Sequence, residues 1–306
     1  MRADNATDVL KKHGKSFYFA RLFLSADSGE AAARLYRFCR VIDDIADESP
    51  DKLQASKDLQ RIQQSISNNT ADDPIVRDFL SLCQQYSIDR QLGNILILGV
   101  LQDLNPVALS CFDELINYAF KVAGVVGLMM APVLGSRPEG YPFAIDLGIA
   151  MQFTNIARDV LEDAKMQRRY LPEEWLGNVS PDELQAPSER QYQLTCNAVR
   201  QLLAVAETYY NSGISGLYYV NHKDKRAIAV AAYIYREIGR DLLARAGDYQ
   251  KGRVVISTRR KCYLAVKALW AVASGKIANQ AVNHDISLHT SLNIHHESEH
   301  DGETSI

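Results

Sequence analysis

The stretch Tyr36-Arg-Phe-Cys-Arg-Val-Ile-Asp-Asp-Ile-Ala-Asp47 decides the fold, because it sets acidic residues into an otherwise apolar helical pattern. Apolar positions recur at spacings of three and four from 31 to 46, which predicts a helix that ends near Ser49-Pro50. Four residues of α-helix turn the chain by about 400°, so Asp43 and Asp47 share one helix face. Two carboxylates therefore project from a helix that otherwise resembles protein core.

A second acidic cluster, Gln152-Phe-Thr-Asn-Ile-Ala-Arg-Asp-Val-Leu-Glu-Asp163, follows more than a hundred residues later. Asp159 and Asp163 repeat the spacing of four, and spacings of three and four add Gln152, Asn155 and Arg158 to neighbouring parts of the same face. Buried carboxylates are costly unless cations compensate them. Hard oxygen ligands suit Mg²⁺, which usually holds substrate phosphates. The two clusters together predict a metal-assisted site for a diphosphate.

Composition excludes several classes of function. The 306 residues are 47% hydrophobic and 23% charged, as in soluble globular proteins, and the net charge of -3 offers no electrostatic basis for binding nucleic acid. The longest apolar run, Val122 to Leu134, is shorter than the roughly 20 residues that span a bilayer. The N-terminus lacks a signal pattern, and the five scattered cysteines indicate reduced packing residues in a cytoplasmic protein. Neither G-x-G-x-x-G nor G-x-x-x-x-G-K-[ST] occurs, so no nucleotide cofactor is indicated.

Helical periodicity continues along the chain, and glycine, proline and asparagine fall mostly between the helical segments. We predict further helices up to about residue 67 and over 74–85, 89–102, 111–134, 142–165, 188–212, 225–246 and 257–275. The acidic clusters have to converge, so residues 1–279 are predicted to form one all-α catalytic domain. Residues 280–306 are polar and hold five of the seven histidines. For this tail we favour a mobile, solvated terminus over a metal-binding segment.

Several basic and polar groups near the acidic clusters have two readings. Arg40 and Arg158 either clamp phosphate oxygens or form salt bridges within their helices. His13-Gly-Lys-Ser-Phe17 precedes the first core helix, where Ser16 is expected to cap a helix and backbone amides to face a phosphate. Arg168-Arg169-Tyr170 either closes over a diphosphate or supplies a helix C-terminal charge and a packing ring.

The segment Ala123-Gly-Val-Val-Gly-Leu-Met-Met130 places two glycines three apart in an apolar helix. Each glycine costs about 1 kcal/mol relative to alanine there, so a reason is needed. Gly124 and Gly127 either allow a second helix to approach closely or leave room for a long apolar ligand, with the methionines as an adaptable wall. The two readings are compatible.

With these motifs in order, the chain resembles the squalene and phytoene synthase family. The resemblance spans about residues 11 to 272 and rests on five motifs: His13 to Phe17, Tyr36 to Asp47, Ala123 to Met130, Gln152 to Asp163, and Tyr170-Leu-Pro172. Weaker matches follow at Tyr235-Arg-Glu-Ile-Gly239 and Gly252-Arg-Val-Val-Ile-Ser257. Within the family, the third and fourth motifs are most similar to those of bacterial phytoene synthases. The chain departs from the family at Gln167-Arg168-Arg169, where many members have a glycine-arginine pair, which leaves open which arginine faces the site.

The resemblance implies an isoprenoid-synthase helical bundle around a deep central cavity. It implies that Mg²⁺, or Mn²⁺ in its place, is held by Asp43, Asp47, Asn155, Asp159 and Asp163. Arg40 and Arg158 then join the four aspartates in catalysis. The residues expected to contact substrate or to line its cavity are His13, Ser16, Tyr36, Gly124, Gly127, Gln152, Asn155, Tyr170, Tyr235 and Arg253.

The implied reaction joins two geranylgeranyl diphosphates head to head. The first ionises, the double bond of the second attacks the cation, and proton loss closes the cyclopropane of prephytoene diphosphate. This intermediate ionises in turn, rearranges and loses a proton to give phytoene, a carotenoid precursor, with released diphosphate as a plausible base. A dry apolar wall has to protect the cations from water.

Two alternatives stay open at this point. Within the family, farnesyl diphosphate would give dehydrosqualene, presqualene diphosphate or squalene, and the last of these needs a hydride donor. Outside the family, the chain would be a non-catalytic helical scaffold whose acidic pairs lie on the surface without a catalytic role. Since substrate and product are both apolar, we also expect peripheral membrane contact and contacts with other enzymes of the pathway.

Overall fold

The computed structural model of the protein describes residues 6–292, and within this range the secondary structure is helical apart from one short ladder. In that ladder β1 (Val107–Ala108) pairs in parallel with β2 (Arg168–Arg169). The predicted all-α class is confirmed. The longer helices are α3 (Ala26–Asp47), α4 (Lys52–Ser67), α5 (Pro74–Tyr86), α6 (Gln91–Gln102), α9 (Tyr141–Lys165), α12 (Glu189–Ser215), α13 (Lys225–Ala244) and α14 (Thr258–Ala273). The shorter helices are α1 (Ala6–His13), α2 (Lys15–Arg21), α7 (Phe112–Ala119), α8 (Val125–Val133), α10 (Glu173–Leu176) and α11 (Pro181–Gln185). A π-helical turn, η1 (Phe120–Gly124), joins α7 to α8, and 3₁₀ turns lie at η2 (Pro138–Gly140), η3 (Gly216–Tyr219), η4 (Tyr249–Lys251) and η5 (Ile286–His289).

The long helices match the segments predicted from periodicity to within a few residues at most ends. The largest difference is at the start of α3, which begins five residues earlier than its apolar pattern. Ser25 caps this helix, and its side chain accepts a hydrogen bond from the Ser28 amide. The cap is anchored in turn, because the Ser25 amide donates to the buried Asp224 carboxylate at 2.9 Å. The first acidic pair therefore stands at the far end of a helix whose beginning is fixed.

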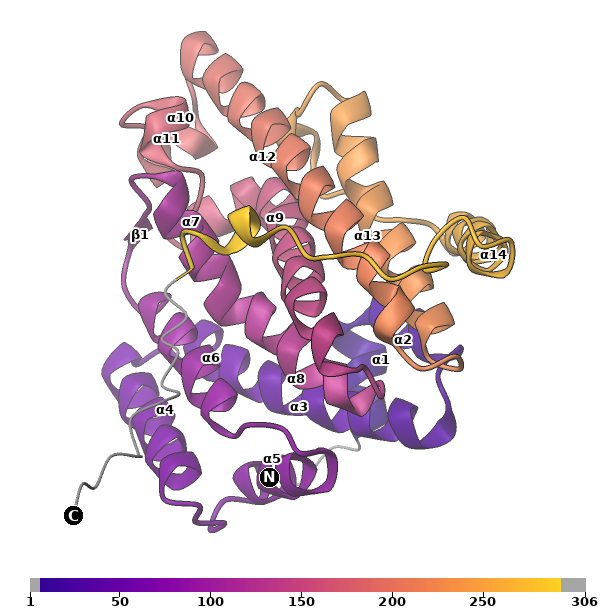
Figure 1. The fold of residues 1–306 in the computed structure, drawn as a ribbon. Coiled ribbons are helices and arrows are strands. Elements are labelled where there is room, and N and C mark those ends of the chain that lie inside the picture. Colours follow the sequence, from indigo (N-terminus) through magenta and orange to yellow (C-terminus); the bar gives the residue numbers. More distant parts are fainter. Residues whose placement is uncertain (1–5, 293–306) are drawn as a thin grey trace, which may run out of the picture.

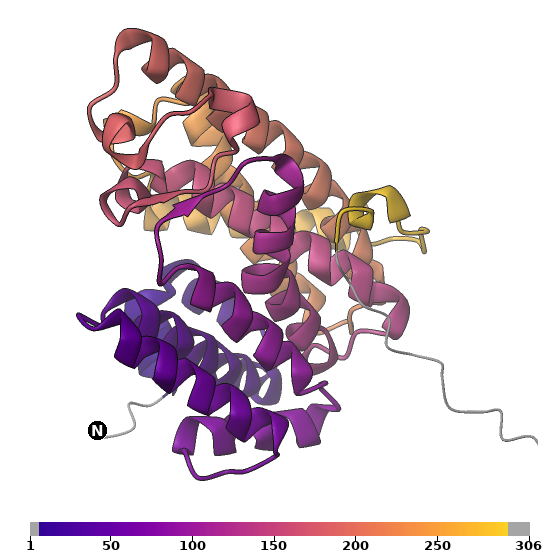
Figure 2. The same cartoon turned by 90° about the vertical axis from the view of Figure 1, so that its left-hand side faces the viewer.

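The helices form two stacked groups that follow the chain order. In Figure 1 and in the turned view of Figure 2, the indigo and purple helices α3 to α6 lie below, and the magenta to orange helices α9, α12 and α13 lie above. One hydrophobic core runs through both groups, from Ala20 to Leu292. Helices α3 and α9, which carry the acidic clusters, belong to different groups and have to meet between them.

Close backbone contacts fix α9 at the centre of the upper group. A Cβ on Gly127 of α8 would lie 2.1 Å from the Ala144 carbonyl oxygen of α9, and a Cβ on Gly148 would lie 2.3 Å from the Ala123 oxygen. These positions therefore admit only glycine without a backbone shift. On its other side α9 packs on α12, and the Thr154 hydroxyl lies 3.0 Å from the hydroxyl of Tyr210.

Helix α3 turns its opposite face to α5. The rings of Phe38 and Phe79 stack with centroids 3.9 Å apart. Beside them Asp78 forms ion pairs with Arg34 and with Arg37, the latter at 2.9 Å. Phe38 of the first acidic motif thus packs against α5, whereas Asp43 and Asp47 of the same motif do not contribute to this contact.

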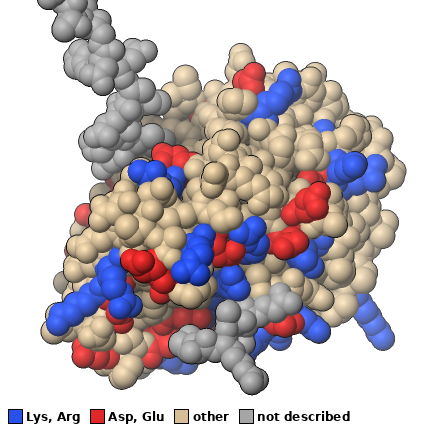
Figure 3. Space-filling model, turned by 90° about the horizontal axis from the view of Figure 1, so that it is seen from below, with Lys and Arg blue, Asp and Glu red and all other residues tan. Residues whose placement is uncertain are grey.

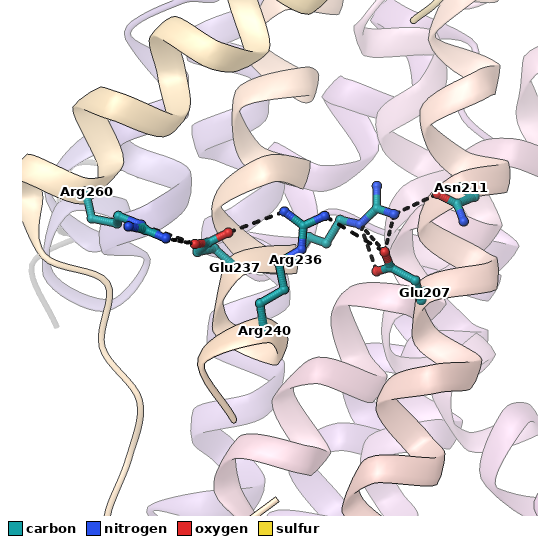
Figure 4. A network of polar contacts seen from close by, with 6 residues as sticks. All are labelled: Glu207, Asn211, Arg236, Glu237, Arg240 and Arg260. Carbon is teal, nitrogen blue, oxygen red and sulfur yellow. Dashed lines mark hydrogen bonds and ion pairs between the residues drawn. The ribbon is translucent and has the colours of Figure 1, made fainter. Parts of the chain in front are cut away.

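A polar network joins the last three long helices, as Figure 4 shows. From α13, Arg236 pairs with Glu207 of α12 and donates to Asn211 at 2.7 Å. The buried Glu237 of α13 accepts from Arg260 of α14, with the Nε bond at 3.1 Å. The network clamps α13 between its neighbours, and α13 carries Tyr235.

Residues 281–292 differ from the predicted solvated tail. They cross the outside of the upper group, where they are yellow in Figure 1. The hydroxyls of Tyr209 and Tyr219 donate to the carbonyls of Leu288 and Val282, both at 2.8 Å, and Leu292 is buried. The prediction failed because these anchors are backbone carbonyls, which leave no periodic mark in the sequence. Histidines 295, 296 and 300 and the rest of the predicted tail lie outside the described residues.

Among the described residues one helical stretch, Phe112–Val133, is long and apolar enough to cross a membrane by length and composition. Half of its most apolar window is buried inside the protein, as expected of a core helix. On the face seen in Figure 3, positive and negative side chains are interspersed rather than gathered into one basic field.

Candidate active site

The first acidic wall lies on the last two turns of α3. Asp43 and Asp44 are partly buried and Asp47 is exposed by about a third, at 36%. Arg40 pairs with Asp44 one turn on, and its distance to Glu48 is 4.0 Å. Arg40 thus makes a salt bridge within its own helix, which leaves Asp43 without a guanidinium partner among the described ion pairs.

The second acidic wall lies on α9, where the helix is bent. Asp159 has the non-helical dihedral angles φ −105° and ψ 16°, so two helical segments join at this residue. Its carboxylate is held from two sides, by Arg158 with an Nε contact of 2.7 Å and by Arg253 with an Nε contact of 2.9 Å. Arg253 arrives from the segment after η4, more than ninety residues later in the chain. Asp163 has no such clamp among the described ion pairs.

Arg168 contacts the first wall from the segment that follows α9. The β1–β2 ladder holds Arg168, whose Nη1 donates to the Asp47 carboxylate of α3 at 2.8 Å. Its Nη2 donates to the carbonyl of Asp103 at 2.8 Å. The side chain of Asp103 accepts from the hydroxyls of Tyr170 at 2.7 Å and Tyr118 at 2.8 Å. The segment after α9 is thereby tied to the end of α3 and to the loop after α6.

The structure decides which of the two consecutive arginines faces the site. Arg169 is buried and turns away, donating to the Leu171 carbonyl at 3.1 Å and lying 3.6 Å from Glu173. Arg168 is the one that reaches Asp47. The preceding Gln167 has a positive φ of 59°, a conformation in which glycine is favoured, and this turn reverses the chain after α9.

Tyrosines 36 and 235 lie between the walls. Phe17 of α2 contacts both rings, with centroid distances of 6.2 Å to Tyr36 and 5.0 Å to Tyr235. Burial and the neighbouring Tyr235 raise the pKa of Tyr36 to about 12, so it stays a neutral hydroxyl. Gly14 is packed against the same ring, because an added Cβ would lie 2.9 Å from Tyr36 Cζ. The His13-to-Phe17 motif thus supports the tyrosines.

One carboxylate on each wall resists ionisation. Burial, reinforced by the neighbouring charge of Asp47, raises the pKa of Asp43 to about 7. Burial, followed by the charge of Asp159, raises the pKa of Asp163 well above its usual range, although the Arg168 guanidinium opposes this. Both shifts indicate negative charge that the protein alone does not compensate.

Asn155 shows a further sign of an incomplete site. Its amide nitrogen donates to the Gln152 side chain at 3.3 Å. Its oxygen Oδ1 is buried and has no hydrogen-bond partner among the described residues. A buried carbonyl oxygen without a donor is unfavourable unless a cation or ligand binds it.

The structure corrects the predicted role of Ser16, supports one of the two roles of Gly124 and Gly127, and does not test that of His13. Ser16 does not cap α2, since it lies inside the helix and Gly14 occupies the cap position without a side-chain bond. Gly124 and Gly127 have the close-packing role: a Cβ on Gly124 would lie 3.3 Å from Ile145 of α9, and a Cβ on Gly127 would meet the Ala144 carbonyl oxygen. The room that they leave for a ligand stays a prediction. The side chain of His13 lies outside the described residues, so its predicted contact also stays a prediction.

Asp103 and Tyr118 are site residues that the sequence did not reveal. Asp103 follows α6 in the loop Asp103-Leu-Asn-Pro106, which reads as a helix end. Asp103 reaches Tyr170 and Arg168 only in the folded chain. A single aspartate after an apolar helix does not indicate a functional role in the sequence. The volume of the surface hollows does not reveal the position of the site. A hollow of about 890 Å³ lies behind α3, lined by Arg34 and Asp78 among others but by none of the acidic pairs.

The fold and the site together define a class, the all-α prenyltransferases, with two acidic helices, arginines from several elements and neighbouring tyrosines. The profile of the squalene/phytoene synthase family matches residues 10–260. The chain belongs to this family of prenyltransferases, as the motifs predicted.

Curated relatives and solved structures agree with this assignment. A phytoene synthase of Pseudescherichia vulneris is 31% identical over 288 residues, which cover 89% of this chain and 93% of the relative. A 15-cis-phytoene synthase of Enterobacter agglomerans is 30% identical over 281 residues, covering 87% and 95%. The crystal structure of a dehydrosqualene synthase in complex with a ligand superposes with a TM-score of 0.78 at 27% identity, covering 88% of this chain and 95% of that one. The predicted isoprenoid-synthase fold is thus confirmed.

Proposed function

We propose that the protein condenses two geranylgeranyl diphosphates head to head, through prephytoene diphosphate, to give phytoene. The observation that carries the proposal is the set of two acidic pairs on α3 and α9, the first of which is held through Asp47 by Arg168 from the segment after α9. Relatives of about 30% identity that are named 15-cis-phytoene synthase support the choice of product. Carotenoid biosynthesis in the cytoplasm is the corresponding setting.

Mg²⁺ fits the residues of the two walls. The available donors are the carboxylates of Asp43, Asp47, Asp159 and Asp163 and the unpartnered amide oxygen of Asn155. All are hard oxygen ligands, and two of the carboxylates have raised pKa values that a bound cation would lower. When bound, Mg²⁺ supplies charge stabilisation for a departing diphosphate. Mn²⁺ suits the same ligands.

The arginines are proposed to exchange partners when substrate binds. Without diphosphate, Arg40 and Arg158 bind acids on their own helices, and Arg253 binds Asp159. Two oxygens of a phosphate can accept paired hydrogen bonds from one guanidinium, as the two oxygens of a carboxylate do, so these guanidiniums can transfer to substrate once cations occupy the acids. The arginines would then form salt bridges within the protein in the free enzyme and clamp phosphate oxygens in the substrate complex.

Tyr36, Tyr235 and Tyr170 are proposed to border the reacting carbons. Their hydroxyls stay protonated at neutral pH, because burial raises the pKa of each. Neutral aromatic walls exclude water and stabilise a carbocation through the ring faces. Ser16 and Gln152 are proposed to complete the diphosphate end, and His13 to lie beside it.

The farnesyl diphosphate reaction is kept as a second candidate because the dehydrosqualene synthase structure is similar at 27% identity. The test is product analysis by mass spectrometry. Purified protein is incubated with Mg²⁺ and either geranylgeranyl or farnesyl diphosphate, with and without NADPH. We expect a forty-carbon hydrocarbon from geranylgeranyl diphosphate without NADPH. A thirty-carbon product alone would replace the substrate assignment, and release of diphosphate from neither would contradict the enzymatic proposal.

Peripheral membrane contact is proposed to run through α14, which lies at the edge of the molecule in Figure 1. Tyr263, Val266 and Trp270 are 59%, 67% and 56% exposed at spacings of three and four along this helix. The segment 258–276 contains five basic and no acidic residues. An apolar stripe with basic flanks suits an anionic membrane surface.

Liposome flotation tests this docking surface. The triple variant Y263S/V266S/W270S should lose most of its binding to vesicles that contain anionic lipid. The matched control L22S removes an exposed apolar residue, 65% exposed, elsewhere. Equal flotation of both variants with the parent protein would rule out α14 as the contact. Binding to other enzymes of the pathway is proposed only as a consequence of sharing this membrane surface.

A further inference from the structure

Away from the acidic walls, α9 carries a buried carboxylate with unusual partners. Asp146 is 0% exposed and lies on the part of α9 that faces α12 and the C-terminal segment. Its Oδ2 lies 2.8 Å from Nε2 of His284, and its Oδ1 lies 2.7 Å from Nε2 of His289. Ser212 of α12 donates its hydroxyl to Oδ2. Each carboxylate oxygen thus faces an imidazole nitrogen.

Charge makes this arrangement different from the other buried carboxylates. Among the described residues, Asp146 forms no ion pair with lysine or arginine, and the titratable side chains that lie against its two oxygens are those of His284 and His289. Asp224, by contrast, is satisfied by the neutral donors Ser25, Ser28 and Asn221. A fully buried carboxylate beside two imidazoles calls for a positive charge at their common centre.

Ring contacts and hydrogen bonds of their segment hold His284 and His289 beside Asp146, where a positive charge would lie. The His284 ring meets Phe143 edge-on, with centroids 5.1 Å apart, and the His284 and His289 rings are 4.4 Å apart. Both residues stand on a segment that hydrogen bonds from Tyr209 and Tyr219 fasten to the protein. The three ligand atoms lie within 4.8 Å of one another.

The donor set also has the dimensions of a transition-metal site. Zinc binds imidazole nitrogen at about 2.0–2.1 Å and carboxylate oxygen at about 2.0–2.2 Å, so tetrahedral ligands are roughly 3.3–3.5 Å apart. The nitrogen–oxygen distances of 2.7 and 2.8 Å would have to open by less than an ångström. A fourth position is available to Ser212 or to water. Two imidazoles and one carboxylate favour Zn²⁺ over Mg²⁺, which prefers oxygen ligands alone.

We propose that Asp146, His284 and His289 bind one Zn²⁺ ion, at a structural site separate from the acidic walls. The ion joins the C-terminal segment to the helix that carries Asp159 and Asp163. Its ligands come from two parts of the chain that are more than 130 residues apart, so it acts as a clip between them.

The test uses the full chain, stripped of metal with a chelator and then titrated with Zn²⁺ by calorimetry, and with Co²⁺ by visible absorption. We expect one Zn²⁺ per chain, a tetrahedral Co²⁺ spectrum, and a rise in Tm of about 5 °C at saturating Zn²⁺. H284A and H289A should each weaken Zn²⁺ binding at least tenfold and lose the Co²⁺ spectrum. Circular dichroism checks that both variants are folded.

Two matched variants separate this site from other histidines. H222A removes an exposed histidine elsewhere, and H295A/H296A/H300A removes the last three; both should bind Zn²⁺ as the parent does. Binding that survives in H284A and H289A, or is lost in the triple variant, overturns the proposal. Absence of any 1:1 binding in the parent overturns it in favour of a metal-free clip made by protonated imidazoles.

Discussion

The two acidic walls look alike in sequence, but the structure neutralises them differently. On α9, Asp159 is clamped by Arg158 from the adjacent position and by Arg253 from a distant loop. On α3, Arg40 serves Asp44, and Asp47 depends on Arg168 from another element altogether. On α3 the two guanidiniums act on different carboxylates, Asp44 and Asp47, whereas on α9 both act on Asp159; Asp43 and Asp163 are left with raised pKa values. Each wall thus combines a salt bridge within its own helix with one from a distant part of the chain, and the difference teaches that only the second wall concentrates both on one carboxylate.

The largest effect is expected from removing a ligand on either wall. D47N and D159N should each lower kcat by about 10²–10³-fold, because each removes a proposed ligand of the cations that would stabilise the departing diphosphate. The measurement is steady-state diphosphate release at saturating Mg²⁺. E162Q is the control, since Glu162 is on the second cluster but outside the spacing of four. A drop in E162Q as large as in D159N would remove the distinction between ligand and neighbour.

Arg168 and Arg169 provide the sharpest test of how the first wall is held. R168K should lower kcat/KM by about 10-fold to 100-fold and raise the Mg²⁺ concentration needed, because lysine cannot bridge Asp47 and the Asp103 carbonyl together. R169K should keep kcat/KM within about threefold and act only on Tm, since Arg169 contacts Leu171 and Glu173. Equal losses of activity in both variants would mean that activity does not depend on the contact between Arg168 and Asp47.

The metal-free protein should respond to pH through Asp43. An unfolded aspartate releases its proton near pH 4, whereas folded Asp43 keeps it to a pKa of about 7. At this site the folded state therefore keeps a proton that the unfolded state releases, so the contribution of Asp43 to the free energy of unfolding falls as the pH rises from 4 to 7. D43N should then be about 2 kcal/mol more stable than the parent at pH 8 in EDTA and equal to it at pH 4. Denaturant unfolding measures this, and added Mg²⁺ should remove the difference. Equal stability of D43N and the parent at pH 8 in EDTA would contradict it.

The smallest effect is expected at the turn that delivers Arg168. Gln167 has a φ of 59°, so Q167G should raise the free energy of unfolding by about 0.5–1 kcal/mol, at the expense of an exposed hydrogen bond to Asp182. Activity should stay unchanged, because the path of the chain is the same. K165G, in the last turn of α9, is the control and should lose about 1 kcal/mol. Destabilisation by both would show that Gln167 is not strained.

Much of the fold and part of the site followed from the sequence. The long helices came from apolar periods, which record burial directly, and the four aspartates came from their spacing within those periods. Arg168 stayed ambiguous beside Arg169, because neighbours in a strand point to opposite sides and only the partner strand decides which side is inward. Asp103 escaped notice because its role depends on Tyr118, Tyr170 and Arg168, which lie 15 or more positions away. The anchoring of residues 281–292 was missed for the same reason.

The bend at Asp159 has a consequence for anyone who wishes to transplant this chemistry. In a straight helix, a spacing of four fixes the angle between two side chains, as at Asp43 and Asp47. At Asp159 the backbone leaves the helical region, so the path to Asp163 is not that of a regular turn. Copying only the letters of the second motif into an ideal scaffold would therefore reproduce its composition but misdirect one carboxylate. An engineered binding site for a diphosphate would therefore have to reproduce the non-helical backbone conformation of Asp159 as well as the sequence of the motif.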